Sequence, residues 1–408
     1  MRDYSNSRYY ELCKKYVNRY PNLAGASIAD IILQEEELKT TRANLRMVIG
    51  WCKHELHQGL QEVAEKHNVN LSDVKHLWIK DKDSSIFVKN PDFVIKDFLE
   101  QVSDSFDEIL SKYSSGVIKP LKTAKNYVKK AIKVTTSDDH IGLEPNPGGD
   151  SLYQYEYSGE VYKNSMQKVF NSIIKEYDTH GRFELLLLDN LGDQEDGWNG
   201  YTTRGGHKLD QNMTNAEVFD CVVDTKVNMI VNLVESNVAN KIILRKVAND
   251  NHSGDFGLIV NKAVEKIINR IYSTDIVKIE HLTRFLEHRI YGKHCFILTH
   301  GKDKKNMFKG LPLVLDHKTI NYVNDYIKFY NIDSEYIHLE KGDLHQIGYQ
   351  KCSNFDYRNY MSFAPPSAWV QHNFGLAYSG YSIQIVPKDN NEVQHTDYFL
   401  DYTKKVVQ

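Results

Sequence analysis

The sequence is poor in the residues that mark secreted, fibrous or membrane-spanning proteins. It has 9 prolines and 5 cysteines in 408 residues, and the cysteines are scattered without a close pair. Isolated cysteines in odd number argue against a disulfide framework and a thiolate zinc site, and are typical of a reducing cytoplasm. No apolar run reaches the roughly 18 residues of a transmembrane helix. The start, MRDYSNSRYY, lacks the apolar core of an export signal. We therefore expect a cytoplasmic protein without a membrane partner.

The composition is that of a globular protein and identifies no partner by charge. Lys and Arg number 51 against 54 Asp and Glu, which gives a formal net charge of -3. Hydrophobic residues at 41% and charged residues at 26% argue against disorder and a coiled-coil rod. At roughly 100–200 residues per domain, the length predicts two or three domains. Tyrosine and histidine are plentiful, with 26 and 17 residues, and the histidines lie where the sequence is most informative.

Residues 1–118 are predicted to form a helical domain. Apolar residues at three- and four-residue spacing predict helices over 9–20, 28–38 and 41–60, and 76–79 is strand-like. Three short helices separated by turns could form a helix-turn-helix that binds DNA, or a helical bundle that binds another partner. Residues 119–131 are rich in lysine and are interpreted as a basic linker, either solvated or following a phosphate backbone.

Residues 132–408 show a different pattern, in which short apolar runs alternate with long amphipathic ones. The runs are 132–136, 161–177, 183–188, 216–238, 242–247, 256–272 and 295–299. Strands that alternate with helices of this length predict an α/β domain whose sheet is covered on both faces.

Polar clusters follow the predicted strands of this domain. They are SDDHIG at 137–142, LGDQEDG at 191–197, ANDNHS at 248–253, THG at 299–301 and GDLH at 342–345. Any one alone is most simply a turn, because Asp, Asn, Gly and Ser end strands in any case. Together they place Asp, Asn or His at the carboxyl ends of successive strands, which is where α/β sheets bind ligands.

The residue types in these clusters predict a centre of two metal ions. Carboxylate, imidazole and carboxamide groups suit divalent ions such as Mn, Fe or Zn. Asp138 and His140, two positions apart on a loop, can both reach one ion. An aspartate between two ions can bridge them, and Asp193 is the best candidate.

The order of these motifs resembles the calcineurin-like metallophosphoesterases. That family's usual motifs are DxH, GDxxD, GNH(D/E), H and GHxH, and this chain has DxH, GDxxD, NH, HG and GxxH over roughly residues 133–385. A finer likeness to phage-encoded members with an amino-terminal helix-turn-helix is carried by 76–80, 84–91 and 365–381. It would place the protein in the host cytoplasm. The family implies a four-layered α/β (α+β) sandwich with two sheets packed face to face. We expect the chain from about Tyr349 to complete the second sheet, since 381–387 alternates like a strand.

Carried over position by position, the resemblance implies a role for each site residue. One ion would be held by Asp138, His140 and His345, and a second by Asn251, His300 and Asp343, with Asp193 as the bridge. His252 would protonate the leaving oxygen, and Asp196 would orient a ligand rather than bind an ion. The two divalent ions, Mn first and Fe, Zn or Mg as alternatives, would activate water for direct attack on phosphorus.

Two departures from the family pattern leave alternatives open. Asp250 stands where the family usually has Gly, so a register that uses Asn249 and Asp250 competes with the one that uses Asn251. Asp343 replaces the usual first His of the last motif. A carboxylate there favours a harder metal such as Mn over Zn. A relative with a single metal, or an inactive one, stays an alternative.

Basic residues near two of the motifs predict the substrate. Lys302, Lys304, Lys305 and Lys309 follow His300, and Trp198, Tyr201, Arg204, His207 and Lys208 follow Asp193 on a loop expected to overhang the site. Charges interleaved with aromatic rings are typical of a groove for single-stranded nucleic acid. We predict a DNA nuclease, by resemblance a homodimer, with Lys302, Lys304, Lys305 and Arg204 as substrate contacts. The alternatives are a phosphatase or small-nucleotide phosphodiesterase with a protein-binding amino-terminal domain, and a DNA-binding or structural protein whose metal site has decayed.

Overall fold

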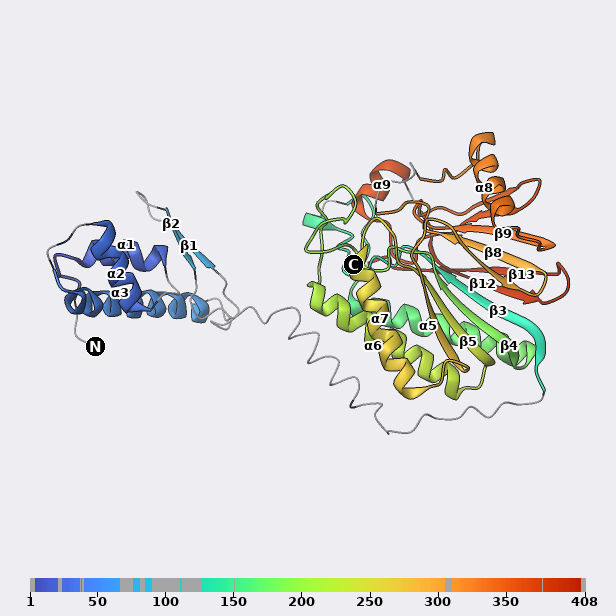
Figure 1. Ribbon diagram of the computed structural model, residues 1–408, viewed down its shortest axis with the longest axis horizontal. Helices are drawn as coiled ribbons and strands as arrows, with labels where there is room; N and C mark the ends of the chain where they lie inside the picture. The colour runs from blue at the N-terminus through green and yellow to red at the C-terminus, as the bar shows by residue number, and fades with distance from the viewer. Residues whose placement is uncertain are drawn as a thin grey trace. The chain divides into compact units, whose positions relative to one another are not determined.

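The chain divides into two compact units, Met1–Asp97 and Phe98–Gln408 (Figure 1). The computed structural model describes residues 4–20, 24–36, 38, 40–66, 76–80, 85–89, 111, 126–149, 151–304, 310–375 and 377–404. Each unit has its own hydrophobic core. Among the helices described, none combines the length and apolar character needed to cross a bilayer.

The first unit consists of three helices followed by a hairpin. The helices are α1 (Tyr10–Arg19), α2 (Gly25–Glu35) and α3 (Arg42–Lys66), and the antiparallel strands are β1 (His76–Lys80) and β2 (Ser85–Lys89). The three predicted helices are therefore confirmed, with the third running further than expected. Val17, Ile32 and Ile49, one from each helix, are buried together and show why the spacing of apolar residues predicted these elements.

The second unit begins with a six-stranded sheet in the order β13-β12-β3-β4-β5-β6. Its parallel strands are β3 (Val128–Thr136), β4 (Phe183–Asn190), β5 (Ala239–Val247) and β6 (Val277–Leu282). They are connected by α5 (Gly159–His180), α6 (Asn215–Glu235) and α7 (Asp255–Ile271), which lie along one side of the sheet in Figure 1. The main core packs these helices against that face. β3 starts at Val128, inside the predicted linker, whose residues 119–125 lie outside the described part of the chain.

A second sheet has five strands in the order β10-β11-β9-β8-β7. They are β7 (Glu287–Tyr291), β8 (His294–Thr299), β9 (Tyr336–Lys341), β10 (Gly348–Lys351) and β11 (Asp356–Asn359). Helix α8 (His317–Phe329) packs Val323 against this sheet's own core. Phe296, Leu298 and Val386 belong to a separate core, which draws on strands of both sheets. The unit is thus a four-layered α/β fold of helices, sheet, sheet and helix, which confirms the predicted fold class.

The face of the first sheet opposite its helices is covered by the second sheet, so the sheet is covered on both faces as predicted. One expectation about the sheets was wrong. The strand predicted at 381–387 is β12 (Ser379–Pro387), which pairs with β3 in the first sheet, and β13 (Gln394–Leu400) follows it there; β10 and β11 join the second sheet. β12 is buried at every position because its two faces meet α5 and the other sheet. Alternation in its sequence therefore could not tell which sheet it enters.

Buried ion pairs connect the two sheets. The Nζ of Lys133 lies 2.5 Å from Oε2 of Glu340 and 3.3 Å from Oδ2 of Asp189. Arg245 donates to both carboxylate oxygens of Asp189 over 2.6 and 2.5 Å. Because charges inside a protein must be matched, these pairs favour one alignment of β3, β4 and β5 against β9. The alignment sets how the strand ends of the two sheets face each other.

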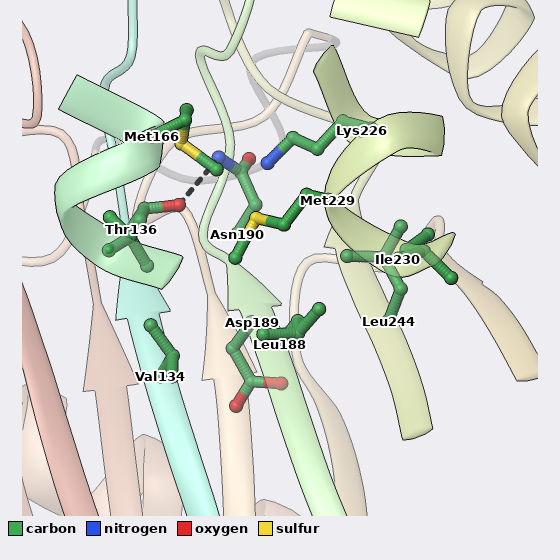
Figure 2. A pocket seen from close by; sticks show the side chains of 11 residues that line it. Val134, Thr136, Met166, Leu188, Asp189, Asn190, Lys226, Met229, Ile230 and Leu244 are labelled. Atoms are coloured by element: carbon green, nitrogen blue, oxygen red, sulfur yellow. Dashed lines mark hydrogen bonds between the residues drawn. The ribbon is translucent and has the colours of Figure 1, made fainter. Parts of the chain in front are cut away.

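A small cavity of about 20 Å³ lies where α5 and α6 cover β3, β4 and β5 (Figure 2). Such a volume holds about one water molecule. Asn190 lines it at the end of β4, and its Nδ2 donates to Oγ1 of Thr136 over 3.1 Å. Its Oδ1 accepts the backbone N–H of Gly192 over 3.1 Å. The side chain of Asn190 therefore fixes the turn that carries Asp193.

Candidate metal centre

The predicted polar clusters follow strand ends in both sheets. Asp138 and His140 follow β3, Asp193 follows β4, Asn251 follows β5, His300 follows β8, and Asp343 and His345 follow β9. Since β3, β4 and β5 run parallel, as do β8 and β9, each sheet delivers its side chains at a single edge. Contacts between the two sets bring these side chains together.

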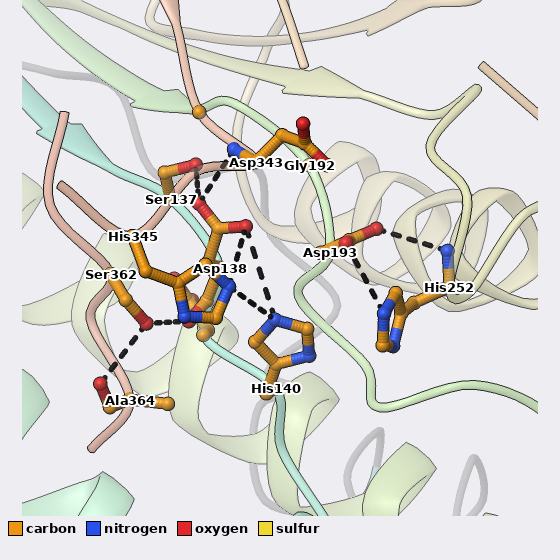
Figure 3. Close-up of polar contacts among 12 residues, drawn as sticks. Ser137, Asp138, His140, Gly192, Asp193, His252, Asp343, His345, Ser362 and Ala364 are labelled. Carbon is orange, nitrogen blue, oxygen red and sulfur yellow. Dashed lines mark hydrogen bonds and ion pairs between the residues drawn. The ribbon is translucent and has the colours of Figure 1, made fainter. Parts of the chain in front are cut away.

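Asp138, His140 and His345 form a first ligand group (Figure 3). Nε2 of His345 lies 3.4 Å from Oδ1 of Asp138 and 3.3 Å from Nε2 of His140, and the remaining side of this triangle is 3.9 Å. Donors about 2.1 Å from one ion are roughly 3.0–3.5 Å apart in octahedral or tetrahedral geometry. The triangle therefore fits one divalent ion with little rearrangement.

Asp193 and His300 lie at the centre of a second group. Oδ2 of Asp193 is 3.0 Å from Nε2 of His300, and Oδ1 of Asp343 is 3.8 Å from the same nitrogen. Oδ1 of Asn251 and Oδ2 of Asp343 are buried and accept no hydrogen bond within the described part of the chain. Buried oxygens without a donor are costly, so a cation is the partner that would satisfy them.

Asp138 takes a position that the sequence did not predict. Its carboxylate belongs to the first group and also lies within reach of Asp193 and His300. The backbone N–H of Asp343 and the hydroxyl of Ser137 both donate to its Oδ2. Asp138 therefore belongs to both groups. Asp193 likewise belongs to two groups, one with Asp138 and His300 and one with His140 and His252.

Hydrogen bonds to the far ring nitrogen orient the histidines. Nδ1 of His140 lies 2.9 Å from Oδ1 of Asp196, and Nδ1 of His300 lies 2.9 Å from the carbonyl oxygen of Leu191. An acceptor at Nδ1 places the proton there and leaves the Nε2 lone pair for an ion. Asp196 therefore has the orienting geometry that the resemblance implied, and its Oδ1 also lies 3.2 Å from Nδ1 of His252.

The backbone is strained at the candidate ligands. Among the residues described, eight other than glycine have positive φ, and five of these are Asp138, His140, Asp193, Asp343 and His345, at 54°, 41°, 49°, 71° and 52°. Side chains with a Cβ rarely adopt this region, and such strain gathers at functional sites. This marker is independent of any family resemblance.

Gly192 shows why the motif before Asp193 requires glycine. Its φ is +105°, and a Cβ at this position would lie 2.8 Å from Nδ1 of His300. The turn can therefore pass behind the His300 ring only without a side chain.

Charges in the site shift the pKa values of its groups strongly. Burial would lower the pKa of His252 and His300, but the nearby carboxylates, Asp193 foremost, outweigh it and raise these values to about 9 and about 10. Burial would raise the pKa of Asp193, yet the charges of His300 and His252 hold it well below its usual range. The protonated imidazoles thus supply the positive charge beside the buried carboxylates.

In the alternative register, which uses Asn249 and Asp250, the Asp250 carboxylate lies in a turn. Oδ1 of Asp250 accepts the N–H groups of Ser253 and Gly254 over 2.8 and 3.0 Å, and the Ser253 hydroxyl over 2.9 Å. These bonds shape the entry into α7. Burial, with the charge of Asp193, raises the pKa of Asp250 to about 6. The geometry therefore favours Asn251, which lines the cavity over the site.

That cavity has a volume of about 530 Å³ and both groups border on it. The basic residues Arg204, His207, Lys208 and Lys302 line it, together with His252 and Asn251. Nζ of Lys302 lies 3.0 Å from Oδ1 of Asp343. Arg204 and Lys302 therefore line a cavity that a substrate anion could enter, and their role as substrate contacts stays a prediction.

Other predicted substrate contacts are placed differently. Lys304 forms an ion pair with Asp255 at the start of α7 and does not line the cavity. Lys305 and Lys309 lie outside the described residues. Trp198 packs against Phe256, with 4.8 Å between ring centroids, and Tyr201 is also absent from the lining.

The aromatic side chains that line the cavity were missed. They are Trp369 and Phe374 of α9 (Ala368–Phe374), a helix in the stretch 365–381 that the sequence marked only by its likeness to phage members. The signal that could have found them is Ser367, whose hydroxyl caps the helix by accepting the N–H of Val370.

No family model matches the chain, and no curated protein matches it. Three solved structures show a distant likeness. An archaeal phosphodiesterase is 10% identical, with a TM-score of 0.31 over 66% of this chain and 99% of that chain. Vps29 of Entamoeba histolytica in complex with zinc is 11% identical, with a TM-score of 0.28 over 66% and 98%. A protein of Streptococcus pneumoniae described as a predicted phosphoesterase is 11% identical, with a TM-score of 0.24 over 66% and 98%. TM-scores this low carry no argument about function, which rests on the geometry of the site.

Proposed function

We propose that the chain is a metal-dependent phosphodiester hydrolase, a nuclease that cleaves DNA. The observation that carries the proposal is the convergence of carboxylate, imidazole and carboxamide donors beneath a cavity with basic walls. Two divalent ions held by these donors, Mn in the first place, would supply an activated water and neutralise charge on phosphorus. Asp138, His140 and His345 would hold one ion, and Asp193, Asn251, His300 and Asp343 the other.

His252 is the proposed general acid. Its backbone N–H donates to Oδ1 of Asp193 over 3.1 Å, which fixes the residue beside the ligands. The contact between its Nδ1 and Asp196 leaves Nε2 as the nitrogen that can give a proton to the leaving oxygen. Arg204 and Lys302 would hold the phosphate oxygens by charge-assisted hydrogen bonds.

The five cysteines support attack by water rather than by a thiolate. All are buried: Cys13 and Cys52 in the core of the first unit, Cys221 in the main core, and Cys295 and Cys352 in the core of the second sheet. Burial raises the pKa of the Cys221 thiol to about 11. None of them lines the cavity over the site.

The first unit supports DNA as the substrate. In α3, Leu45 and Ile49 are buried while Asn44 and Arg46 are exposed, so the start of the helix presents polar and basic groups to solvent. A helix of this kind, preceded by two others, is typical of units that enter the major groove. The proposal assigns DNA binding to this face.

A phosphatase or a small-nucleotide phosphodiesterase is the second candidate. The cavity volume of about 530 Å³ favours this second candidate, because a single nucleotide would fit inside.

The test compares ester classes on matched variants. Bis-p-nitrophenyl phosphate, p-nitrophenyl phosphate and labelled single- and double-stranded DNA are incubated with Mn or EDTA. The proteins are the wild type, His252→Ala and the control His281→Ala, which removes a histidine paired with Glu265 outside the site. We expect Mn-dependent cleavage of diester and DNA, reduced about 10²–10⁴-fold in His252→Ala only.

DNA binding in EDTA should be unchanged in both variants. Turnover of the monoester alone would establish the phosphatase, and no turnover with any divalent metal would overturn the hydrolase proposal.

A further inference from the structure

The cavity over the metal centre has an aromatic wall that the proposed hydrolysis does not use. Trp369 and Phe374 of α9 both line it, with ring centroids 5.7 Å apart and an interplanar angle of 75°. Trp369 is 65% exposed and Phe374 is 43% exposed. Large rings left open to solvent inside a cavity are typical of a surface that a ligand covers.

The helix that carries these rings is fixed to the body of the unit. Nε2 of Gln371 donates to the carbonyl oxygens of Tyr153 and Pro366, each over 3.2 Å, and its Oε1 accepts the N–H of Tyr153 over 2.8 Å. Val370 and Gln371 are buried. The helix that carries the rings is therefore held in place before a ligand arrives, which lowers the entropic cost of binding.

Cationic side chains line the same cavity. Arg204, Lys208 and Lys302 do so, and so do five candidate metal ligands: His140, Asp193, Asn251, Asp343 and His345. This combination recognises a molecule with an anionic group and a flat ring. An apolar peptide side chain would suit the rings but would leave the cationic groups unmatched.

We propose that Trp369 and Phe374 form a stacking platform for a nucleobase, while the phosphodiester next to that base lies at the metal centre. The inference rests on the proposed function and extends it to a substrate class. Aromatic rings stack on the flat face of a base. Every base has such a face, so little sequence preference is expected. A base inside a duplex has both faces covered by its neighbours, and the platform therefore selects single strands or frayed ends.

The test compares two tetranucleotides that differ only in their bases. One is thymidine tetranucleotide, and the other has the same sugar-phosphate backbone with abasic sugars. KM and kcat are measured with Mn for the wild type, Trp369→Leu, Trp369→Phe and Phe329→Leu. The last is the matched control, since Phe329 is 77% exposed on α8 and does not line the cavity.

We expect Trp369→Leu to raise the KM for the thymidine substrate about tenfold, with kcat nearly unchanged. The KM for the abasic substrate should stay at the wild-type value. Trp369→Phe keeps a ring and should retain most of the affinity, and Phe329→Leu should match the wild type. Circular dichroism of each variant confirms that it is folded.

An unchanged KM in Trp369→Leu, or an equal rise for both substrates, would overturn the platform and leave the hydrolase proposal standing. If no protein cleaves either substrate, the proposed function fails, and tryptophan fluorescence then decides the platform. Quenching by the thymidine tetranucleotide that is present in the wild type and lost in Trp369→Phe would support it. Equal quenching in the two proteins, or none, would overturn it.

Discussion

Replacing Asp196 by Asn tests whether one carboxylate orients two histidines of the site. Oδ1 of Asp196 lies 2.9 Å from Nδ1 of His140 and 3.2 Å from Nδ1 of His252, and the residue is 2% exposed. Burial would raise the pKa of Asp196, but the hydrogen bonds to the two histidines outweigh it and lower the pKa. The group is therefore a carboxylate, and Asp196→Asn removes its charge while keeping its shape.

The expected loss follows from the strength of the two contacts. A hydrogen bond to a charged group contributes about 1.5–3 kcal/mol and a neutral one about 0.5–1.5 kcal/mol, so each histidine loses roughly 1–1.5 kcal/mol. That is about a tenfold effect for each histidine. Of these two histidines only His140 is a proposed metal ligand, so metal affinity should fall about tenfold. Turnover depends on His140 and His252 and should fall about 100-fold at subsaturating Mn and about tenfold at saturation.

The assay separates these effects. Mn affinity is measured by competition with a fluorescent chelator, and kcat with bis-p-nitrophenyl phosphate at limiting and saturating Mn. The control is Asp275→Asn, an exposed carboxylate in the turn before β6. Metal affinity and turnover within twofold of the wild type would refute the orienting role. Full recovery of kcat at saturating Mn would show that Asp196 does not set the His252 tautomer.

Three further outcomes are expected. Lys302→Met frees the Asp343 oxygen that now lies 3.0 Å from the ammonium, so calorimetry should show tighter binding of a second Mn while the KM for a diester rises. In metal-free protein the pKa values of His252 and His300 are raised to about 9 and about 10, because nearby carboxylates outweigh burial. Their stabilisation is complete below pH 6.5 and is lost as pH rises through these values. The free energy of unfolding in EDTA should therefore fall by about 1–3 kcal/mol from pH 7 to pH 8, which a lower Tm would show, and Mn should abolish the fall. Gly192→Ala forces a Cβ against the His300 ring and should lower both Tm and Mn affinity, whereas Gly206→Ala, where a Cβ meets no atom within 4 Å, should leave Mn affinity unchanged.

The sequence predicted the parts of the site that depend on residue type and strand order. Asp138, His140, Asp193 and His300 could be predicted because polar residues at the carboxyl ends of parallel strands meet at one edge. The ion pair between Lys302 and Asp343 could not, since it depends on how two loops approach each other.

The aromatic wall was hidden for a different reason. Helix α9 has seven residues, too few for a periodic pattern, and stands between Pro366 and Gly375 in a stretch that reads as a loop. The sheet to which β12 belongs was hidden because a strand buried on both faces carries no sign of which neighbour covers it. A local sequence pattern indicates that a residue is buried, but only the folded structure shows which element covers it.

The left-handed backbone of the ligands has a consequence for how such a site is lost. Asp138, His140 and His345 hold positive φ angles that glycine would adopt at lower cost. A chain that binds metals through these residues, as proposed, retains that cost, of order 1–2 kcal/mol for each residue. In a relative that no longer needs the metals, glycine at these positions would stabilise the protein at once. Decay should therefore begin at the ligands themselves, and glycines in the DxH and GxxH motifs would identify a descendant that keeps the fold without the chemistry.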